Sequence, residues 1–133
     1  IVCEKFIEAK NSLLPEDYKF LCFNGRAEYC MVCTERETGN TKFYYCDREW
    51  NLVRMHKEHR NIPSDFHIPK PQGLDKMLQY ADTLSKPFPF VRVDLYNVEG
   101  KIIFGELTFT PFGGINSSMI EEMDLMLGNM LKL

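Results

Sequence analysis

The chain has 133 residues, of which 44% are hydrophobic and 26% charged, and its formal net charge is −3. This composition is typical of a globular protein and suffices for one domain, 1–133, with its own core. The negative charge argues against sequence-independent binding of nucleic acid, and no apolar run approaches the ~20 residues of a membrane span.

The first half of the chain predicts a series of strands. Residues 1–7 resemble a strand that leads into a connection, and residues 17–23 alternate between apolar and polar. Asn24-Gly25 is a strong signal for a hairpin turn, so residues 26–34 would form the returning strand. A turn at 37–40 and a strand at 41–46 follow. Residues 47–72 are charged and then rich in proline, which predicts a loop with one helical turn.

The second half predicts two helices around a hairpin. Apolar residues at helical spacing predict a helix over 73–86, which Pro87 and Pro89 end. Ser118 and Glu121 have the spacing of a capping box for a last helix. Its buried stripe would consist of Met119, Ile120, Met123, Leu127, Met130 and Leu131. We therefore expect an α+β fold with a mostly antiparallel sheet and packed helices.

The cysteines indicate reduced thiols. They are odd in number and scattered through apolar segments: Cys3, Cys22, Cys30, Cys33 and Cys46. With no signal-peptide pattern, this predicts a cytoplasmic protein. Cys30 and Cys33 have C-x-x-C spacing, but residues three apart on a strand point to opposite faces. His56 and His59 could complete a zinc site, yet their spacing is shorter than usual. We prefer core cysteines and solvated histidines, His67 included.

The segment VRVDLYNVEGKIIFGELTFTP, residues 91–111, carries charges inside two apolar strands. A three-residue connection ending at Gly100 is expected. In that register Arg92 lies opposite Glu106. Asp94 lies opposite Phe104, and alternation places Ile103 on the apolar face. The other face would carry Arg92, Asp94, Glu106 and Thr108.

Two carboxylates and a hydroxyl on adjacent strands can bind a hard cation through oxygen ligands. Magnesium typically uses one or two carboxylates together with substrate phosphates. An arginine beside them can hold a transferring phosphoryl group. The simpler interpretation, which charge placement alone favours, is a cross-strand ion pair between Arg92 and Glu106 on a solvated face.

Several segments resemble the ATP-grasp superfamily. RVD, a hairpin and GELTFTP are similar to its C-terminal metal-binding hairpin, which has Arg-x-Asp, a turn, and Glu-x-Asn with a proline three residues on. VCEKFI resembles its nucleotide hinge, and DYKFLCFNGRAEYCMV the next paired strands. LPEDYKFLCFNG, FPFVRVDLYNVEGKIIFGELTFTP and MDLMLG resemble the TupA-like subfamily, named for teichuronopeptide biosynthesis. The resemblance covers nearly the whole chain.

The resemblance implies roles for individual residues of the hairpin. Asp94 and Glu106 would bind Mg²⁺, with Glu106 as the bridging ligand. Thr108 stands where the superfamily usually has Asn and would be a weaker ligand. Arg92 would act in catalysis by contacting the transferring phosphate and the acyl-phosphate intermediate.

The resemblance also implies nucleotide contacts from the first half of the chain. The hinge against adenine would be formed by Glu4, Lys5 and Phe6. Asp17 would reach the ribose hydroxyls, and Lys19 and Arg48 would contact phosphate. Gly113-Gly114 departs from the Gly-Ser-Gly that the subfamily tends to place after the proline.

The whole pattern implies the C-terminal lobe of an ATP-grasp fold. No glycine-rich phosphate loop precedes residue 73 and the chain opens on Ile1, so we expect a longer protein with an N-terminal lobe, and weak activity without that lobe. The intact protein would use ATP and Mg²⁺ as an ADP-forming carboxylate–amine ligase, joining carboxylate and amine substrates of a cell-surface polysaccharide or teichuronopeptide.

Two alternatives stay open. One is a polysaccharide glycosyltransferase, although the chain has no D-x-D metal motif. The other is a nucleotide-binding module without catalysis, which the absence of a first lobe and the threonine at position 108 both allow.

Overall fold

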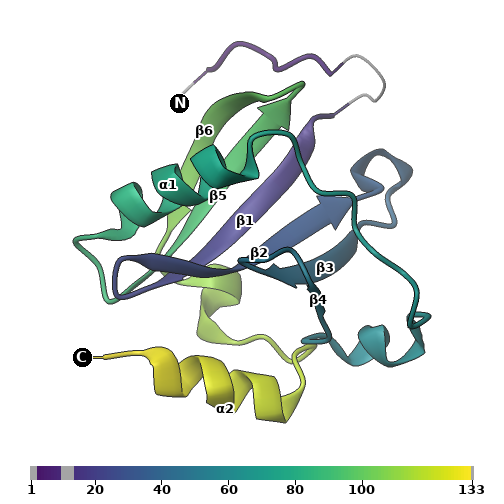
Figure 1. Ribbon diagram of the computed structural model, residues 1–133, viewed down its shortest axis with the longest axis vertical. Coiled ribbons are helices and arrows are strands. Elements are labelled where there is room, and N and C mark those ends of the chain that lie inside the picture. The colour runs from purple at the N-terminus through teal and green to yellow at the C-terminus, as the bar shows by residue number, and fades with distance from the viewer. Residues whose placement is uncertain (1–2, 10–13, 133) are drawn as a thin grey trace.

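Six strands form an antiparallel sheet in the computed structural model, which describes residues 3–9 and 14–132 (Figure 1). They lie in the spatial order β4-β3-β2-β1-β5-β6, so the late hairpin β5–β6 adds to the early strands along β1. The strands are β1 Glu16–Phe23, β2 Arg26–Thr34, β3 Lys42–Asp47, β4 Leu52–Val53, β5 Phe90–Val98 and β6 Lys101–Thr108.

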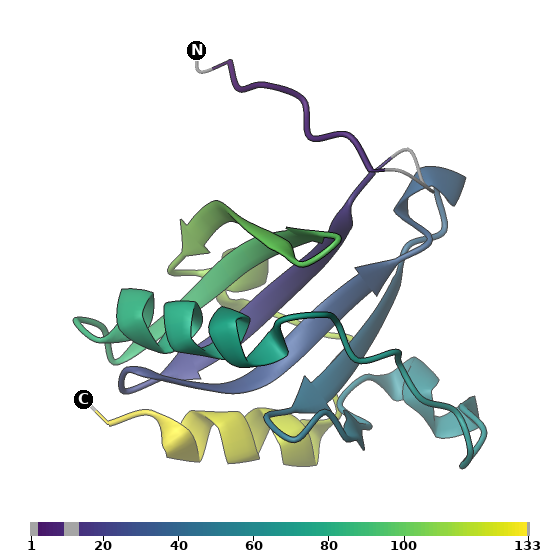
Figure 2. The ribbon, with the colours of Figure 1, turned by 45° about the horizontal axis from the view of Figure 1, so that its top comes forward.

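Two α-helices in the described part of the chain cover opposite faces of the sheet (Figure 2). They are α1 Leu74–Ser85 and α2 Glu121–Met130, and short 3-10 helices lie at Arg36–Thr38, Lys57–Asn61 and Pro111–Gly114. The predicted α+β class with an antiparallel sheet and packed helices is confirmed. No helix within residues 3–9 and 14–132 is both long and apolar enough to cross a membrane.

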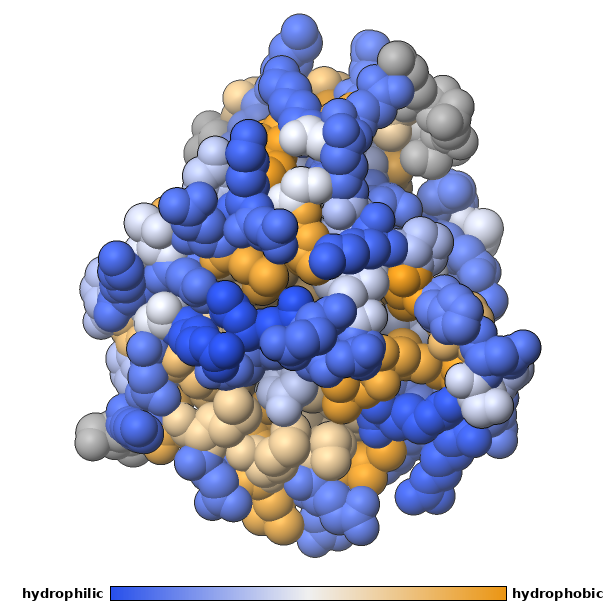
Figure 3. Space-filling model, in the orientation of Figure 1, coloured by the Kyte–Doolittle hydropathy of each residue, from blue (hydrophilic) through white to orange (hydrophobic). Residues whose placement is uncertain are grey.

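Alternation along the central strands divides the core into two layers. One layer lies under α1. Its fully buried members include Phe20, Met77, Val91 and Val93. In the layer under α2, Leu21, Phe23 and Leu127 each keep between 7% and 9% of their surface exposed. Methionines fill the outer part of this second layer, and Figure 3 shows an apolar area over α2 that is framed by hydrophilic side chains. Met119, Met123, Leu127 and Met130 of the predicted stripe therefore pack as core residues, whereas Leu131 is exposed.

Both hairpins of the central strands turn through two residues. Residues 24–25 and 99–100 all have positive φ, as tight hairpin turns require, and each pair ends in glycine. The predicted hairpin at Asn24-Gly25 is confirmed. The predicted three-residue connection before Gly100 is wrong, because Val98 already pairs with Lys101.

The last helix begins without the predicted capping box. Its N-cap is Ile120, and no side chain caps it. The N–H of Ile120 donates instead to the carbonyl of Met55, and that of Lys57 donates to the carbonyl of Ser118. The chain is held extended at this point, so the helix begins only at Glu121.

Two further expectations about strands and histidines are wrong. Residues 3–7 form no strand, while residues 1–2 lie outside the described part. His59 is buried, and its Nε2 lies 2.6 Å from the carbonyl oxygen of Phe43. His67 is exposed as predicted.

The cysteines follow the prediction for a strand. Cys30 packs in the layer under α1 and Cys33 in the layer under α2, so their thiols lie on opposite faces. Cys22 and Cys46 are also buried, whereas Cys3 is exposed. Burial raises the pKa of the Cys46 thiol to about 12, which makes it an inert core residue.

Candidate functional site

The four polar side chains predicted to share one face of the hairpin do so. Arg92 pairs with Thr108, and Asp94 pairs with Glu106. Both predicted pairs are wrong by two residues. The two-residue turn shifts the register by one, and a bulge between Asp94 and the next residue shifts it by one more. Since two single shifts restore the alternation, the shared face survives the wrong register.

The bulge depends on Gly105, the extra residue of β6. A Cβ on this glycine would lie 3.0 Å from the carbonyl oxygen of Asp94, so the two strands can approach only because the side chain is absent. Because of the same bulge, the prediction for one residue of the apolar face is wrong. Ile103 pairs with Tyr96, and Ile102 packs against the layer under α1 in its place.

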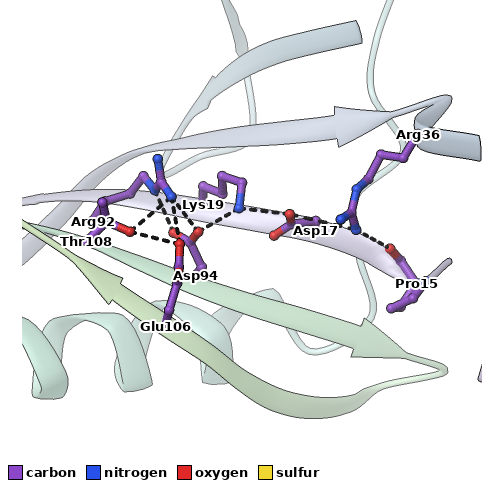
Figure 4. A network of polar contacts seen from close by, with 8 residues as sticks. All are labelled: Pro15, Asp17, Lys19, Arg36, Arg92, Asp94, Glu106 and Thr108. Carbon is purple, nitrogen blue, oxygen red and sulfur yellow. Dashed lines mark hydrogen bonds and ion pairs between the residues drawn. The ribbon is translucent and has the colours of Figure 1, made fainter. Parts of the chain in front are cut away.

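One nitrogen of Arg92 lies where three side-chain oxygens converge (Figure 4). Its Nη2 donates to Asp94 Oδ2 at 2.7 Å, to Thr108 Oγ1 at 3.0 Å and to Glu106 Oε1 at 3.2 Å. Nε donates to Asp94 Oδ1 at 2.7 Å, which completes a bidentate pair. The Thr108 hydroxyl donates to Glu106 Oε1 at 3.0 Å. The predicted ion pair between Arg92 and Glu106 is thus one contact of a larger cluster.

The cluster is buried on the β5 side and open on the β6 side. Asp94 is buried, whereas the Glu106 side chain is 63% exposed. Nη1 of Arg92 makes no hydrogen bond within the described residues, and Figure 4 shows this nitrogen pointing away from Asp94 and Glu106. The site therefore offers an incoming ligand one exposed carboxylate and one unused cationic donor.

Lys19 and Asp17 extend the cluster along β1. Lys19 Nζ lies 2.6 Å from Asp94 Oδ2 and 2.8 Å from Asp17 Oδ2, so it bridges the two acids. Arg36 follows at 3.8 Å from Asp17 Oδ2 and donates to the carbonyl of Pro15. Positive and negative groups thus alternate from Arg92 to Arg36, and the row reaches the exposed Glu106 at its other end (Figure 4).

Asp17 has one buried oxygen, Oδ1, that accepts no hydrogen bond from residues 3–9 or 14–132. A buried carboxylate oxygen without a donor is costly, and such exceptions often lie at functional sites. A ribose hydroxyl could donate a hydrogen bond to this oxygen, and contact with the ribose hydroxyls is the role predicted for Asp17. Because the oxygen is covered, the surrounding chain would have to shift for that contact.

The charges within the row affect the pKa of its cations. Burial acts to lower the pKa of Lys19, but the hydrogen bonds and charges of Asp17 and Asp94 outweigh it and raise that pKa. For Arg92, burial again acts to lower the pKa, and Asp94 and Glu106 raise it overall. Both cations stay charged at neutral pH and hold the acids in place.

The oxygen atoms around Arg92 Nη2 form a donor set that fits a hard cation. Two carboxylates and one hydroxyl are the oxygen ligands that Mg²⁺ takes in proteins, with phosphates completing the shell. No group of three or more His, Cys, Asp or Glu side chains gathers into a metal site in residues 3–9 and 14–132. The C-x-x-C pair and its neighbouring histidines accordingly form no such group.

The structure does not bring every predicted residue to this cluster. Glu4, Lys5 and Phe6 lie in an irregular, exposed segment, and within the described residues no hydrogen bond or ion pair joins them to it. This segment runs away from the body of the molecule in Figure 2. Arg48 forms a bidentate ion pair with Asp82 of α1, on the opposite face of the sheet. Asp82 holds the guanidinium of Arg48 away from the cluster, so its predicted phosphate contact stays a prediction.

A comparison with protein-family models matches this chain over residues 1–132 to TupA-like ATPgrasp. The chain belongs to the TupA-like ATP-grasp family. The match spans all six strands and both helices, so the polar cluster lies within the matched part of the chain. Comparisons with curated proteins and with solved structures returned no match.

Within this ATP-grasp domain, sequence reasoning missed Arg36 as a member of the cluster. Arg36 follows β2 and reaches Asp17 because Asp17 pairs with Cys33 at the end of that strand. Arg36 lies two positions beyond the end of β2, and no sequence motif marks a charged residue at such a position. Only the register of β1 with β2 could have indicated it.

Proposed function

We propose that the chain is the C-terminal lobe of an ATP-dependent, ADP-forming carboxylate–amine ligase, and that an N-terminal lobe of the same protein completes the site. Membership of the TupA-like ATP-grasp family supports the use of ATP. The observation that carries the proposal is the convergence of Asp94, Glu106 and Thr108 on one nitrogen of Arg92. The resemblance of the sequence to a subfamily named for teichuronopeptide biosynthesis suggests a cell-surface polymer as the product, and the buried free thiols favour the cytoplasm as the place of the reaction.

Three residues of the chain would hold Mg²⁺: Asp94, Glu106 and Thr108. When bound there, the metal would neutralise phosphate charge and polarise the transferring group. Glu106 is the accessible ligand, since its carboxylate is largely exposed. Asp94 is held from both sides by Arg92 and Lys19, so those two cations set its orientation.

Arg92 would act on the reacting groups directly. In the proposed reaction a carboxylate oxygen attacks the γ-phosphorus of ATP, the bond to the β–γ bridging oxygen breaks, and ADP leaves. An amine then attacks the acyl phosphate, and an amide and phosphate form. The unused Nη1 of Arg92 can donate to the phosphoryl oxygens that carry charge in both steps.

Asp17 and Lys19 would serve the nucleotide. The Asp17 oxygen without a donor is an acceptor suited to a ribose hydroxyl. The ammonium of Lys19 lies between Asp17 and Asp94 and would donate to phosphate oxygens near the metal ligands. Glu4, Lys5 and Phe6 remain proposed hinge residues, and their exposed positions leave them available to adenine or to the other lobe.

The proposal is tested with the full-length protein by measuring ADP release. We expect release that requires Mg²⁺, a carboxylic acid and an amine together. Glu106→Gln should lower it by at least about 100-fold, because the neutral amide is a poor ligand for Mg²⁺. Glu122→Gln, an exposed position in the first turn of α2, is the matched control and should leave the rate unchanged.

Other outcomes would replace the proposal by one of its alternatives. Bound nucleotide without turnover under any substrate would indicate a nucleotide-binding module. Release of a nucleoside diphosphate from a nucleotide sugar, with no requirement for ATP, would indicate a glycosyltransferase.

A further inference from the structure

A cavity of about 580 Å³ lies between the sheet and α2, and Arg92 forms part of its wall. The sheet contributes its α2 face, α2 contributes Leu127 and Gly128, and the loop after β6 contributes Phe112 and Asn116. Cavities of 300–1,000 Å³ are the usual size of small-molecule sites. The cavity thus adjoins the proposed phosphoryl-transfer cluster and shares one residue with it.

The walls of this cavity are predominantly apolar. Of the 18 residues that line it, the polar ones are Arg92, Thr110, Asn116 and Asp124, to which Tyr45 adds a hydroxyl. Leu21, Phe23 and Leu127 line the cavity and each keep between 7% and 9% of their surface exposed. A ligand that covered these side chains would remove apolar surface from water, which favours binding.

The loop that closes the cavity has an unusual backbone. Phe112 has a φ of 54°, in the left-handed region that a bulky side chain rarely adopts. Phe112 and Phe109 are each more than half exposed, and both line the cavity. Strained backbone that presents an apolar side chain to a cavity is typical of binding sites. The aromatic rim would gain contacts when a ligand enters.

We infer that this cavity binds the carboxylic acid substrate and that the acid has an apolar body. The inference rests on the proposed function and adds the class of acid. The carboxylate would meet Nη1 of Arg92, which has no other acceptor in the described chain. The apolar body would lie against the sheet and α2. A sugar acid fits less well, because its hydroxyl groups would lose water without enough partners in these walls.

The chain offers a variant that adds a side chain at the cavity wall without a clash of its Cβ. A Cβ on Gly128 would meet nothing within 4 Å, and Gly128 lines the cavity from within α2. Gly128→Leu therefore extends a side chain into open space and replaces a poor helix former by a good one. Asn129→Leu adds the same side chain at the next, exposed position of the helix, outside the cavity.

The experiment is calorimetric titration of the full-length protein, in the absence of nucleotide, with 3-phenylpropanoate, hexanoate and glucuronate. We expect the two apolar acids to bind at least 10-fold more tightly than glucuronate. Gly128→Leu should weaken the apolar acids at least 10-fold, and Asn129→Leu should not. Equal or tighter binding of glucuronate, or no effect of Gly128→Leu, would overturn the inference.

The test separates this inference from the proposed ligase function. Selective binding of apolar acids that Gly128→Leu abolishes would support the cavity assignment even if no ADP were released. ADP release that depends on glucuronate and not on the apolar acids would leave the ligase in place and overturn the assignment of substrate class.

Discussion

Asp94 and Glu106 lie opposite each other on neighbouring strands, and both carboxylates accept a hydrogen bond from Nη2 of Arg92. Like charges at facing positions of a ladder repel, so the pair is stable only with a cation between the two acids. In this structure a guanidinium nitrogen supplies that charge. The same requirement makes the position suitable for a metal ion.

The guanidinium geometry should be essential to the cluster. Arg92→Lys keeps the charge but loses the bidentate pair with Asp94 and the simultaneous bonds to Glu106 and Thr108. We expect the free energy of unfolding to fall by about 2 kcal/mol, since several charge-assisted hydrogen bonds are lost. Urea denaturation measures this. Arg26→Lys is the control, because that arginine forms an exposed pair with Glu28 and should contribute little. Equal effects of both substitutions would contradict the prediction.

Lys19 should be the stabilising bridge between two acids. Lys19→Met leaves Asp17 and Asp94 without the ammonium between them, and both carboxylates are buried. We expect a loss of about 3 kcal/mol, the usual cost of removing one partner from a buried ion pair. Lys42→Met, which removes an exposed ion pair with Glu35, should change the midpoint of denaturation little. A midpoint for Lys19→Met as high as that of the control would show that the bridge is unimportant.

The bulge in β6 should require glycine. Gly105→Ala places a Cβ 3.0 Å from the backbone oxygen of Asp94, and backbone cannot move aside cheaply. We expect a loss of about 1–3 kcal/mol from this crowding. Gly128→Ala is the opposite case, since its Cβ meets nothing and it lies inside a helix, and it should gain up to about 1 kcal/mol. Thermal unfolding of the two variants would decide, and a neutral Gly105→Ala would argue against the role of the bulge.

Stability should fall in mild acid because of His59. Burial lowers the pKa of this histidine, so the folded state favours the neutral ring. The unfolded chain binds its proton near pH 6.5, and stability is therefore lost as the pH falls below about 6.5 toward the folded pKa. One such group contributes at most about 1.4 kcal/mol per pH unit. His59→Gln keeps a donor for the Phe43 carbonyl. This substitution should reduce the loss of stability as the pH falls below about 6.5.

The exposed His67 provides the control for that experiment. His67→Gln should leave the slope of stability against pH unchanged between pH 7.5 and 5.5, as measured by urea denaturation at each pH. A wild-type slope that persists in the His59→Gln protein would assign the pH dependence to another group.

Local patterns predicted the elements that local forces dominate. The hairpin at Asn24-Gly25 and the helix α1 were predictable because turn chemistry and apolar spacing act within a few residues. The start of α2 was not, because a backbone hydrogen bond from Ile120 to the distant Met55 holds the preceding chain extended. The buried position of His59 was missed for the same reason, since its partner Phe43 belongs to another strand.

The sequence by itself determined that Arg92 and Asp94 share one face of β5 and that Glu106 and Thr108 share one face of β6, because side chains alternate along a strand. That the two pairs meet on the same face was decided by the turn and the bulge together, since either shift alone would place them on opposite faces. Which residues face each other was decided by the tertiary structure, through a tight turn and a bulge at Gly105 that each move the register by one. The same holds for Lys19 and Arg36, which join the cluster only because β1 lies between β2 and β5. The cavity beside Arg92 likewise exists only where α2 and the loop after β6 pack against the sheet, since a space between distant segments leaves no trace in local sequence.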